Sequence, residues 1–533
     1  MPDCTLIASS KTGGPELSRM AKALTGCFFV SLWLLVVALA LEVFSRAAEV
    51  WTQRRNDYLM GRKDFRFPIA PESPFAGTEC CWDGTSGFPL QPISIAPLQH
   101  EGGTAWRQSF EALSETERHL AASVHDENVL AYDRDGRLLE AYGLPTAKQL
   151  LDRVQKRWSA FPFWKVFAGR MIRDLDAGIA DALQGHAVSR EIRLGPGNQP
   201  ERIHFVPGEG NQRVFVYLPN LMALISRSFG PLPEGSAWDV AYYRYRKNVP
   251  NTHGHLPGTF RLNNAGFRGK DVALPKPAGV FRIVCVGGST TEEGGSDETT
   301  YPALLEKKLQ AEFPERRIEV VNCGISGMNT LQQLSRFGDY LALQPDLLIV
   351  YEGVNDAAHL LPQEWLLLDT PPWAAPLYVS HFFRSRYPQW LYWTDQKLRE
   401  SVESLVIDRF RVMKQFAADR GAAIAFCSIA CPPYNRLSDQ EQGYMTHRTR
   451  GFARFLFSPE TYVKTVDEIN LQLKGFCRNE KCFYIPIAEN LQQLGYFVDF
   501  CHLCPEGIER KADMVFQCLR NQLRSLFLAS TSE

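Results

Sequence analysis

The stretch FRIVCVGGSTTEEGG, residues 281–295, decides how the C-terminal half of this sequence folds. It begins with a short, mainly apolar run of the length typical of a buried strand, and two glycines and a serine follow directly. Ser289 therefore stands at a strand-to-helix turn. There it could be a nucleophile, a phosphate-loop residue or the cap of a helix, and the rest of the chain has to decide between these interpretations.

Beyond this turn, apolar runs alternate with helical segments down to the C-terminus. The apolar runs are RIEVVNCG (317–324), DLLIVYEG (346–353), AAIAFCSIA (422–430) and CFYIPI (482–487). Alternating strands and helices with near-continuous apolar strands predict an α/β domain, over residues 281–533, whose parallel sheet is covered on both faces. Ligands of such sheets bind at the carboxyl ends of the strands.

Four short motifs stand at those strand ends or ahead of the closing helix. They are GGS (287–289), NCGISG (322–327), GVND (353–356) and DFCH (499–502). Each motif alone is short enough to arise by chance in an unrelated sequence, and Ser289 by itself would be interpreted as a helix N-cap. Together, and in this order, they resemble the motifs of the SGNH (GDSL-type) hydrolase family over about residues 261–524.

The residue types also suit acyl transfer without reference to a family. Ser289 can supply a nucleophilic hydroxyl, and His502 is the natural base because its ordinary pKa lies near neutrality. Asp499, three residues before His502, can accept the other ring N–H and fix the tautomer. We therefore expect these three residues to form a catalytic triad.

The resemblance implies a three-layer flavodoxin-like fold and further site residues. By the family's pattern, the backbone N–H groups of Ser289 and Gly327 and the side-chain amide of Asn355 would form the oxyanion hole. Gly288 replaces the family's usual aspartate and would let the backbone approach the substrate, and Asn322 would hold the neighbouring loops. Nothing in the sequence indicates a metal, nucleotide or flavin cofactor.

Nucleic-acid and nucleotide binding are both disfavoured. The formal net charge of -1 leaves no global basic field for a polyanion. The glycine-rich turn lacks the G-K-[ST] of a phosphate loop, and Glu292 and Glu293 would repel a phosphate placed there. The expected partners are an acyl ester substrate and a membrane.

An apolar segment near the N-terminus, residues 23–41, predicts a membrane helix after a tail of residues 1–22. It carries no charge, and as a helix it just spans a hydrocarbon core of about 30 Å. The run is long for a cleaved signal peptide, so we expect a single-pass signal anchor. The flanking basic residues favour a cytoplasmic body, whereas large C-terminal domains are often exported regardless, and we expect an extracytoplasmic hydrolase domain.

The middle of the chain divides into three segments. Residues 42–126 predict a helical stalk followed by an irregular linker rich in Pro, Gly and Ser. Residues 127–226 contain a hairpin signal around Gly136, then helical segments, then three strand-like runs. This order resembles a PAS-like sensor domain, and an unspecified α+β packing domain fits it equally well. Residues 227–280 form a connector.

The cysteines are odd in number and lack the spacing of a small disulfide framework. Cys477 with Cys482, or Cys501 with Cys504, could bridge in an exported domain or stay reduced. No second pair stands at zinc spacing, so a metal site is not expected.

An insertion at residues 357–400 is rich in aromatic side chains. These could stack on sugars, line an acyl pocket, contact the bilayer or simply pack a small subdomain. The sequence as a whole predicts a membrane-anchored serine esterase acting on an acyl ester of a glycan or lipid. An O-acyltransferase with the same triad and a non-enzymatic sensor or binding protein are the alternatives, and the sequence does not indicate the oligomeric state.

Overall fold

The computed structural model describes residues 15–59, 66–69, 105–113, 127–142, 173–192, 201–219, 260–361, 394–449 and 459–529, with a few isolated residues between them. Most of the predicted linker and aromatic insertion, and the first part of the connector, lie outside the described residues. Contacts divide the chain into two units, Met1–Lys63 with Pro371–Leu391, and Asp64–Thr370 with Tyr392–Glu533.

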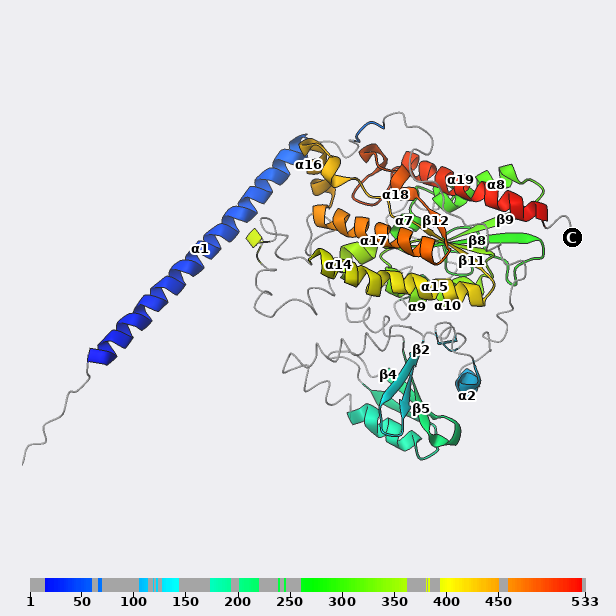
Figure 1. The fold of residues 1–533 in the computed structure, drawn as a ribbon, viewed down its shortest axis with the longest axis horizontal. Coiled ribbons are helices and arrows are strands. Elements are labelled where there is room, and N and C mark those ends of the chain that lie inside the picture. Colours follow the sequence, from blue (N-terminus) through cyan, green and yellow to red (C-terminus); the bar gives the residue numbers. More distant parts are fainter. Residues whose placement is uncertain are drawn as a thin grey trace, which may run out of the picture. The chain divides into compact units, whose positions relative to one another are not determined.

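A five-stranded parallel sheet forms the centre of the C-terminal domain (Figure 1). Its strands are β8 (Val280–Gly287), β9 (Arg317–Gly324), β10 (Leu347–Tyr351), β11 (Ala423–Cys427) and β12 (Phe483–Ile485). They lie in the order β12-β11-β10-β8-β9, with every neighbouring pair parallel. The chain thus changes direction across the sheet at β8, and the carboxyl ends of β8, β9 and β10 lie side by side at this switch point.

Helices cover both faces of the sheet, as the sequence predicted. One face carries α8 (Tyr301–Glu312) and α19 (Pro505–Ala529), and Figure 1 shows α9, α10 and α15 on the other. Within the described residues, the further α-helices of the domain are α7 (Ser289–Glu292), α9 (Thr330–Ser335), α10 (Phe337–Ala342), α14 (Asp395–Val402), α15 (Asp408–Asp419), α16 (Asp439–Thr449), α17 (Pro459–Asn479) and α18 (Ile487–Asn490), with π-helical turns at Asp356–Leu360 and Glu403–Ile407. The α/β fold class is confirmed.

The core of this domain lies between the sheet and the pair α8 and α19. Ile283 and Ile349 from the strands are fully buried against Leu305 of α8 and Leu519 of α19. Burying each such side chain stabilises the fold by about 1.5–3 kcal/mol. This packing holds the end of β8 and the start of α19 in a fixed relation, and predicted site residues lie directly after β8 and shortly ahead of α19.

An antiparallel sheet is described within the predicted α+β region. Its strands are β1 (Glu127–Asp133), β2 (Leu138–Tyr142), β3 (Val188–Ile192), β4 (Glu201–Pro207) and β5 (Arg213–Pro219), in the order β2-β1-β5-β4-β3. The predicted hairpin is present, with Gly136 at φ +73° in its turn. Trp106 in α2 (Ala105–Ser109) packs edge-on against Tyr217 of β5. The PAS-like resemblance and the domain bounds stay predictions.

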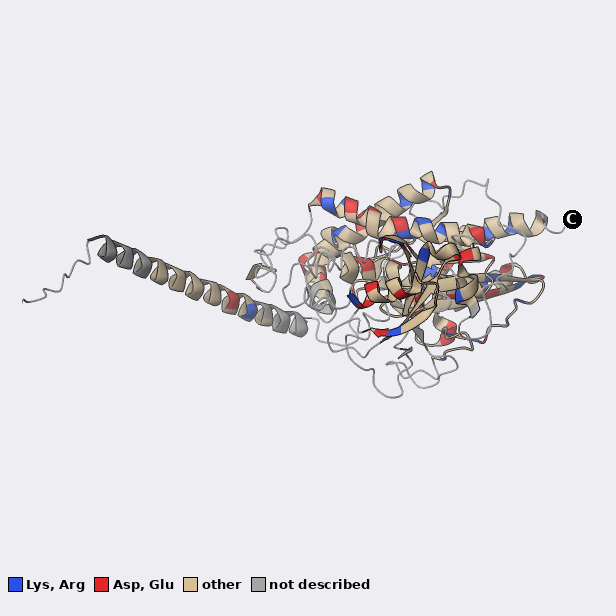
Figure 2. Cartoon of the chain, turned by 90° about the horizontal axis from the view of Figure 1, so that it is seen from below, with Lys and Arg blue, Asp and Glu red and all other residues tan. Residues whose placement is uncertain are grey.

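The N-terminal segment is one long helix, α1 (Pro15–Leu59). Residues Gly26–Ala48 within it have the length and hydropathy needed to cross a membrane, and none of this window is buried. Figure 2 shows few charged residues on the described part of α1. A signal sequence near an N-terminus has the same properties, so the membrane anchor stays a prediction.

Candidate active site

We call the turn that contains Ser289 the nucleophile turn, and α7 the nucleophile helix, after the predicted role of this residue. The turn is built by the tight junction of β8 and α7. Ser289 is the first residue of α7, and Gly288 is its N-cap. A Cβ on Gly287 would lie 2.4 Å from the carbonyl oxygen of Tyr351 in the adjacent strand, so only glycine permits this approach. Ser289 is therefore not the helix cap, and its hydroxyl is left for another partner.

That partner is His502, which approaches from the loop ahead of α19. His502 Nε2 lies 2.8 Å from Ser289 Oγ, and His502 Nδ1 lies 2.7 Å from Asp499 Oδ2. The other carboxylate oxygen, Oδ1, accepts the backbone N–H groups of His502 at 2.7 Å and Cys501 at 2.9 Å. These bonds fix the carboxylate, which in turn orients the imidazole. The structure brings together the three residues that the sequence suggested as a triad.

Electrostatics favour a carboxylate at Asp499 and a basic imidazole at His502. Burial lowers the pKa of His502, but the hydrogen bond and charge of Asp499 and the charge of Glu293 outweigh it, so the pKa lies above its ordinary value. Burial raises the pKa of Asp499, yet its bonds to His502 and the backbone N–H groups leave it lowered overall. A proton on the imidazole is thus stabilised by its surroundings.

The predicted oxyanion-hole residues lie at the same edge of the sheet. Asn355 follows β10, and its buried Nδ2 donates to the carbonyl oxygen of Met328 at 2.7 Å. Gly327, at φ +81°, belongs to the turn after β9 that contains Met328. A Cβ on Gly288 would lie 3.0 Å from Asn355 Nδ2 and 3.3 Å from that Met328 carbonyl. Both elements therefore border the backbone directly ahead of Ser289.

Comparison with known proteins identifies the domain. Residues 285–510 match the model of the GDSL-like lipase/acylhydrolase family. The chain carries a GDSL-like hydrolase domain. The resemblance noted in the sequence is confirmed, and the family match supports an enzyme that hydrolyses esters. A search of curated proteins with this sequence gave no match.

Solved structures similar to the GDSL-like domain come from several bacteria and a metagenome. They include a G-D-S-L family protein from Desulfitobacterium hafniense (16% identity, TM-score 0.28, 45% of this chain and 99% of that chain). A GDSL-like lipase from Bacteroides thetaiotaomicron has 15% identity and a TM-score of 0.26, and the match covers 45% of this chain and 88% of that chain. LAE5, an α/β hydrolase from the metagenome of Lake Arreo, Spain, has 18% identity and a TM-score of 0.28, and the match covers 45% of this chain and 94% of that chain. At these TM-scores the likeness carries no argument about activity.

Asn322, predicted to support the loops of the GDSL-like domain, lies buried near the end of β9. Its Oδ1 accepts the backbone N–H of Gly324 at 3.0 Å, and its backbone bridges to that of Arg268. A Cβ on Gly324 would lie 2.3 Å from the backbone nitrogen of Glu292, so this strand end is pressed against α7. Asn322 thus stabilises the strand end that contacts the nucleophile helix.

The contacts of a buried acidic network behind Asn355 were not predicted from the sequence. Glu352 accepts hydrogen bonds from Gln333 Nε2 at 2.8 Å and from the Gly353 N–H at 2.9 Å. Asp356 accepts the Thr330 N–H at 2.9 Å. Burial raises the pKa of both carboxyl groups. Gln333 and Thr330 belong to α9, which is remote from these carboxylates in sequence, so no local pattern could reveal these contacts.

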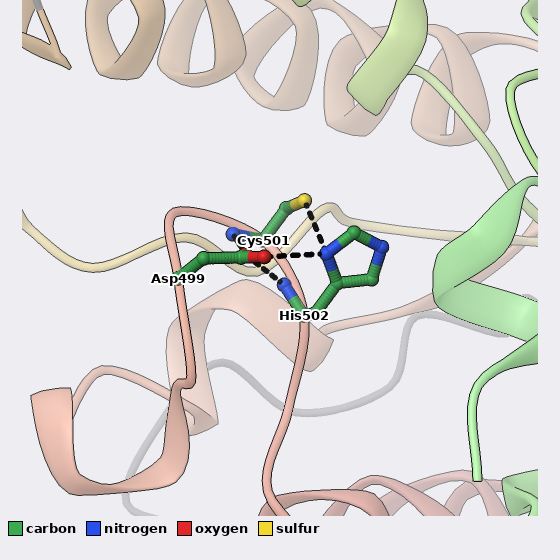
Figure 3. A group of neighbouring side chains, drawn as sticks. All are labelled: Asp499, Cys501 and His502. Carbon is green, nitrogen blue, oxygen red and sulfur yellow. Dashed lines mark hydrogen bonds and ion pairs between the residues drawn. The ribbon is translucent and has the colours of Figure 1, made fainter. Parts of the chain in front are cut away.

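Asp499, Cys501 and His502 also form a group whose ligand atoms all lie within 4.8 Å of one another, as in a metal site (Figure 3). The donors fit a triad better than a metal centre. His502 Nδ1 is already engaged by Asp499, and burial raises the pKa of the Cys501 thiol, which disfavours the thiolate that binds metals. Cys501 and Cys504 are free thiols, as are Cys477 and Cys482.

Proposed function

We propose that the protein is a membrane-anchored serine hydrolase that cleaves carboxylic esters through Ser289, His502 and Asp499. The observation that carries the proposal is the continuous hydrogen-bonded path from Ser289 Oγ through the imidazole to the carboxylate, with steps of 2.8 Å and 2.7 Å. The family match supports ester chemistry, and the apolar segment Gly26–Ala48 supports the anchor.

The first half of the reaction forms an acyl-enzyme. His502 Nε2 accepts the hydroxyl proton as Ser289 Oγ attacks the ester carbonyl carbon, and the carbonyl oxygen becomes an oxyanion. The N–H groups of Ser289 and Gly327 and the amide of Asn355 would donate to this oxygen. The tetrahedral intermediate then collapses, His502 gives its proton to the departing alcohol oxygen, and the acyl group stays on Ser289.

The second half returns the free enzyme. A water molecule loses a proton to His502 Nε2 and attacks the acyl carbon, and the second tetrahedral intermediate expels Ser289 Oγ as His502 returns the proton to it. The products are a carboxylic acid and the regenerated serine. Throughout, Asp499 stabilises the transient imidazolium without taking the proton itself.

The substrate we propose is an acyl ester of a glycan or a lipid at the membrane surface. A glycan hydroxyl in place of water in the second half would make the same site an O-acyltransferase. The two activities differ in one observable. For a transferase, acetyl release from a model ester rises when a glycan acceptor is added, and acetyl appears on the glycan.

Labelling with a fluorophosphonate probe tests the proposed nucleophile. We expect wild type to label and Ser289→Ala to lose labelling, because the probe phosphorus bonds to the activated serine oxygen. His502→Ala should label at least about 100-fold more slowly, since general-base catalysis contributes about 10²–10⁴-fold. Ser525→Ala is the matched control, because Ser525 lies on the exposed surface of α19 and its hydroxyl donates to the carbonyl oxygen of Asn521 in the same helix. Labelling of Ser289→Ala at the wild-type rate would overturn the proposal.

A further inference from the structure

A buried ion pair lies beside the proposed triad and has no part in the reaction steps above. Lys511 of α19 is fully buried, and its Nζ lies 2.7 Å from Oε1 of Glu293, whose side chain is 8% exposed. The same Nζ donates to the carbonyl oxygen of Thr290 at 2.6 Å and lies 4.7 Å from the ring centres of Tyr301 and Tyr351. Lys511 thus ties α19 directly to the helix that Ser289 begins.

The second oxygen of Glu293 reaches the base loop. Glu293 Oε2 accepts the backbone N–H of Leu503, the residue after His502, at 2.9 Å. The backbone N–H of Glu293 itself donates to the carbonyl oxygen of Ser289 at 2.8 Å. One carboxylate therefore links the nucleophile helix, the His502 loop and, through Lys511, the closing helix.

Packing alone does not account for these charges. Two buried charges are costly to desolvate, and apolar side chains of similar volume often stabilise a core at least as well. The pair also acts on the base electrostatically, because the charge of Glu293 raises the pKa of His502 and the charge of Lys511 lowers it. The titratable groups that act on the imidazole include Asp499 and Cys501 from its own loop, Glu293 after α7 and Lys511 of α19. Lys511 in turn lies over the ring of Tyr351 of β10.

We propose that Glu293 and Lys511 are positioning residues of the ester hydrolase, which hold the His502 loop on the nucleophile turn and set the electrostatic environment of the base. The proposal rests on the proposed function, because it assigns His502 the role of general base. It predicts effects of opposite sign for the two halves of the pair, which a purely structural role would not produce.

The test measures kcat/KM for a model ester against pH in the full chain. Glu293→Gln removes the charge that raises the pKa of His502, so the acid limb of the profile should move to lower pH. Lys511→Met removes the charge that lowers it, so the acid limb should move to higher pH. Both variants should also lose kcat/KM at the plateau, roughly ten- to a hundredfold, because base catalysis depends on hydrogen-bond reach between Ser289 and His502.

A double variant and a matched control separate positioning from folding. In Glu293→Gln with Lys511→Met no charge is left unpaired, and the amide oxygen can still accept from Leu503, so the two shifts should largely cancel. Asp513→Asn breaks the partly exposed pair between Lys308 of α8 and Asp513 of α19, which is not part of the Glu293–Lys511 contact, and should leave the profile unchanged. Shifts of the two single variants in the same direction, or no shift in either, would overturn the inference.

An activity-independent measurement keeps this inference distinct from the proposed function. The pKa of His502 is followed by NMR titration of histidine-labelled protein, with the signal assigned from His502→Ala. We expect it to fall in Glu293→Gln and rise in Lys511→Met. If wild type labels at Ser289 but the two variants leave the pKa of His502 unchanged, only the positioning role is contradicted. If the variants shift this pKa as expected but wild type does not label at Ser289, the hydrolase mechanism is contradicted instead.

Discussion

Gly288 illustrates how one absent methyl group shapes the site at the scale of a residue. Its φ of −84° is accessible to any residue, so its backbone conformation does not require glycine. The restriction comes from space, because an added Cβ would lie 3.0 Å from Asn355 Nδ2 and 3.3 Å from the Met328 carbonyl oxygen. Glycine at this position leaves the Asn355 amide beside the nucleophile turn.

We expect Gly288→Ala to lower kcat/KM by roughly 10²-fold, about the effect of losing one oxyanion donor, because the methyl group displaces the Asn355 amide. The thermal midpoint should change little, since the neighbours need to shift by only a few tenths of an ångström. Gly295→Ala in the same loop is the control, because its nearest heavy atom would be 3.9 Å away. Equal activity of both variants and wild type would argue against Asn355 as a donor.

At the scale of an element, the segment before β8 does more than connect two domains. Within this segment, Arg268 is fully buried, with Nε 2.9 Å from Asp297 Oδ1 and its guanidinium 4.4 Å from the ring centre of Phe260. Its other nitrogens donate to the carbonyl oxygens of Glu292 at 2.6 Å and Gly294 at 3.1 Å. Arg268 thus completes the backbone hydrogen bonds of the loop after the nucleophile helix.

Arg268→Ala should lower the free energy of unfolding by roughly 2–4 kcal/mol, because the buried carbonyl groups of Glu292 and Gly294 and the Asp297 carboxylate each lose a charged hydrogen-bond donor. Chemical denaturation followed by tryptophan fluorescence measures this change. Arg261→Ala is the matched control. It breaks the exposed Arg261–Asp271 pair, and such pairs contribute about 0–1 kcal/mol. Similar losses in the two variants would contradict the structural role given to Arg268.

At the scale of the whole molecule, α1 is distinguished by the apolar side chains that it exposes. Phe29, Trp33 and Val36 are each more than half exposed. Exposure of a continuous apolar surface to water is unfavourable by about 25 cal/mol per Å², so a membrane or another apolar surface is expected to cover it.

Removal of residues 1–63 should move the protein from the membrane fraction to the soluble fraction, because the segment that fits a bilayer is lost. Alkaline extraction of membranes followed by immunoblotting measures this partition for the full and shortened chains. Fluorophosphonate labelling of the shortened chain checks that its catalytic domain is folded. A labelled, shortened protein that stays in the membrane fraction would show that α1 is not the anchor.

The sequence by itself determined the order of strands and helices in the GDSL-like domain and the positions of its four motifs. Apolar periodicity and glycine-rich strand ends are local properties, so a single sequence can reveal them. It also located the apolar segment near the N-terminus, because length and lack of charge are sufficient to recognise it. Local signals did not reveal that Arg268, in the predicted connector, belongs to the site's support.

Only the tertiary structure decided which side chains meet. Ser289 and His502 are 213 residues apart, and Glu293 and Lys511 are 218 apart. Their contacts depend on the order of strands in the sheet and on the packing of α19 against it, which no local pattern specifies. The Ser289 hydroxyl meets the imidazole of His502 only when distant segments of the chain pack together. The physical reason is that hydrogen bonds and ion pairs act over a few ångströms in space, irrespective of separation along the chain.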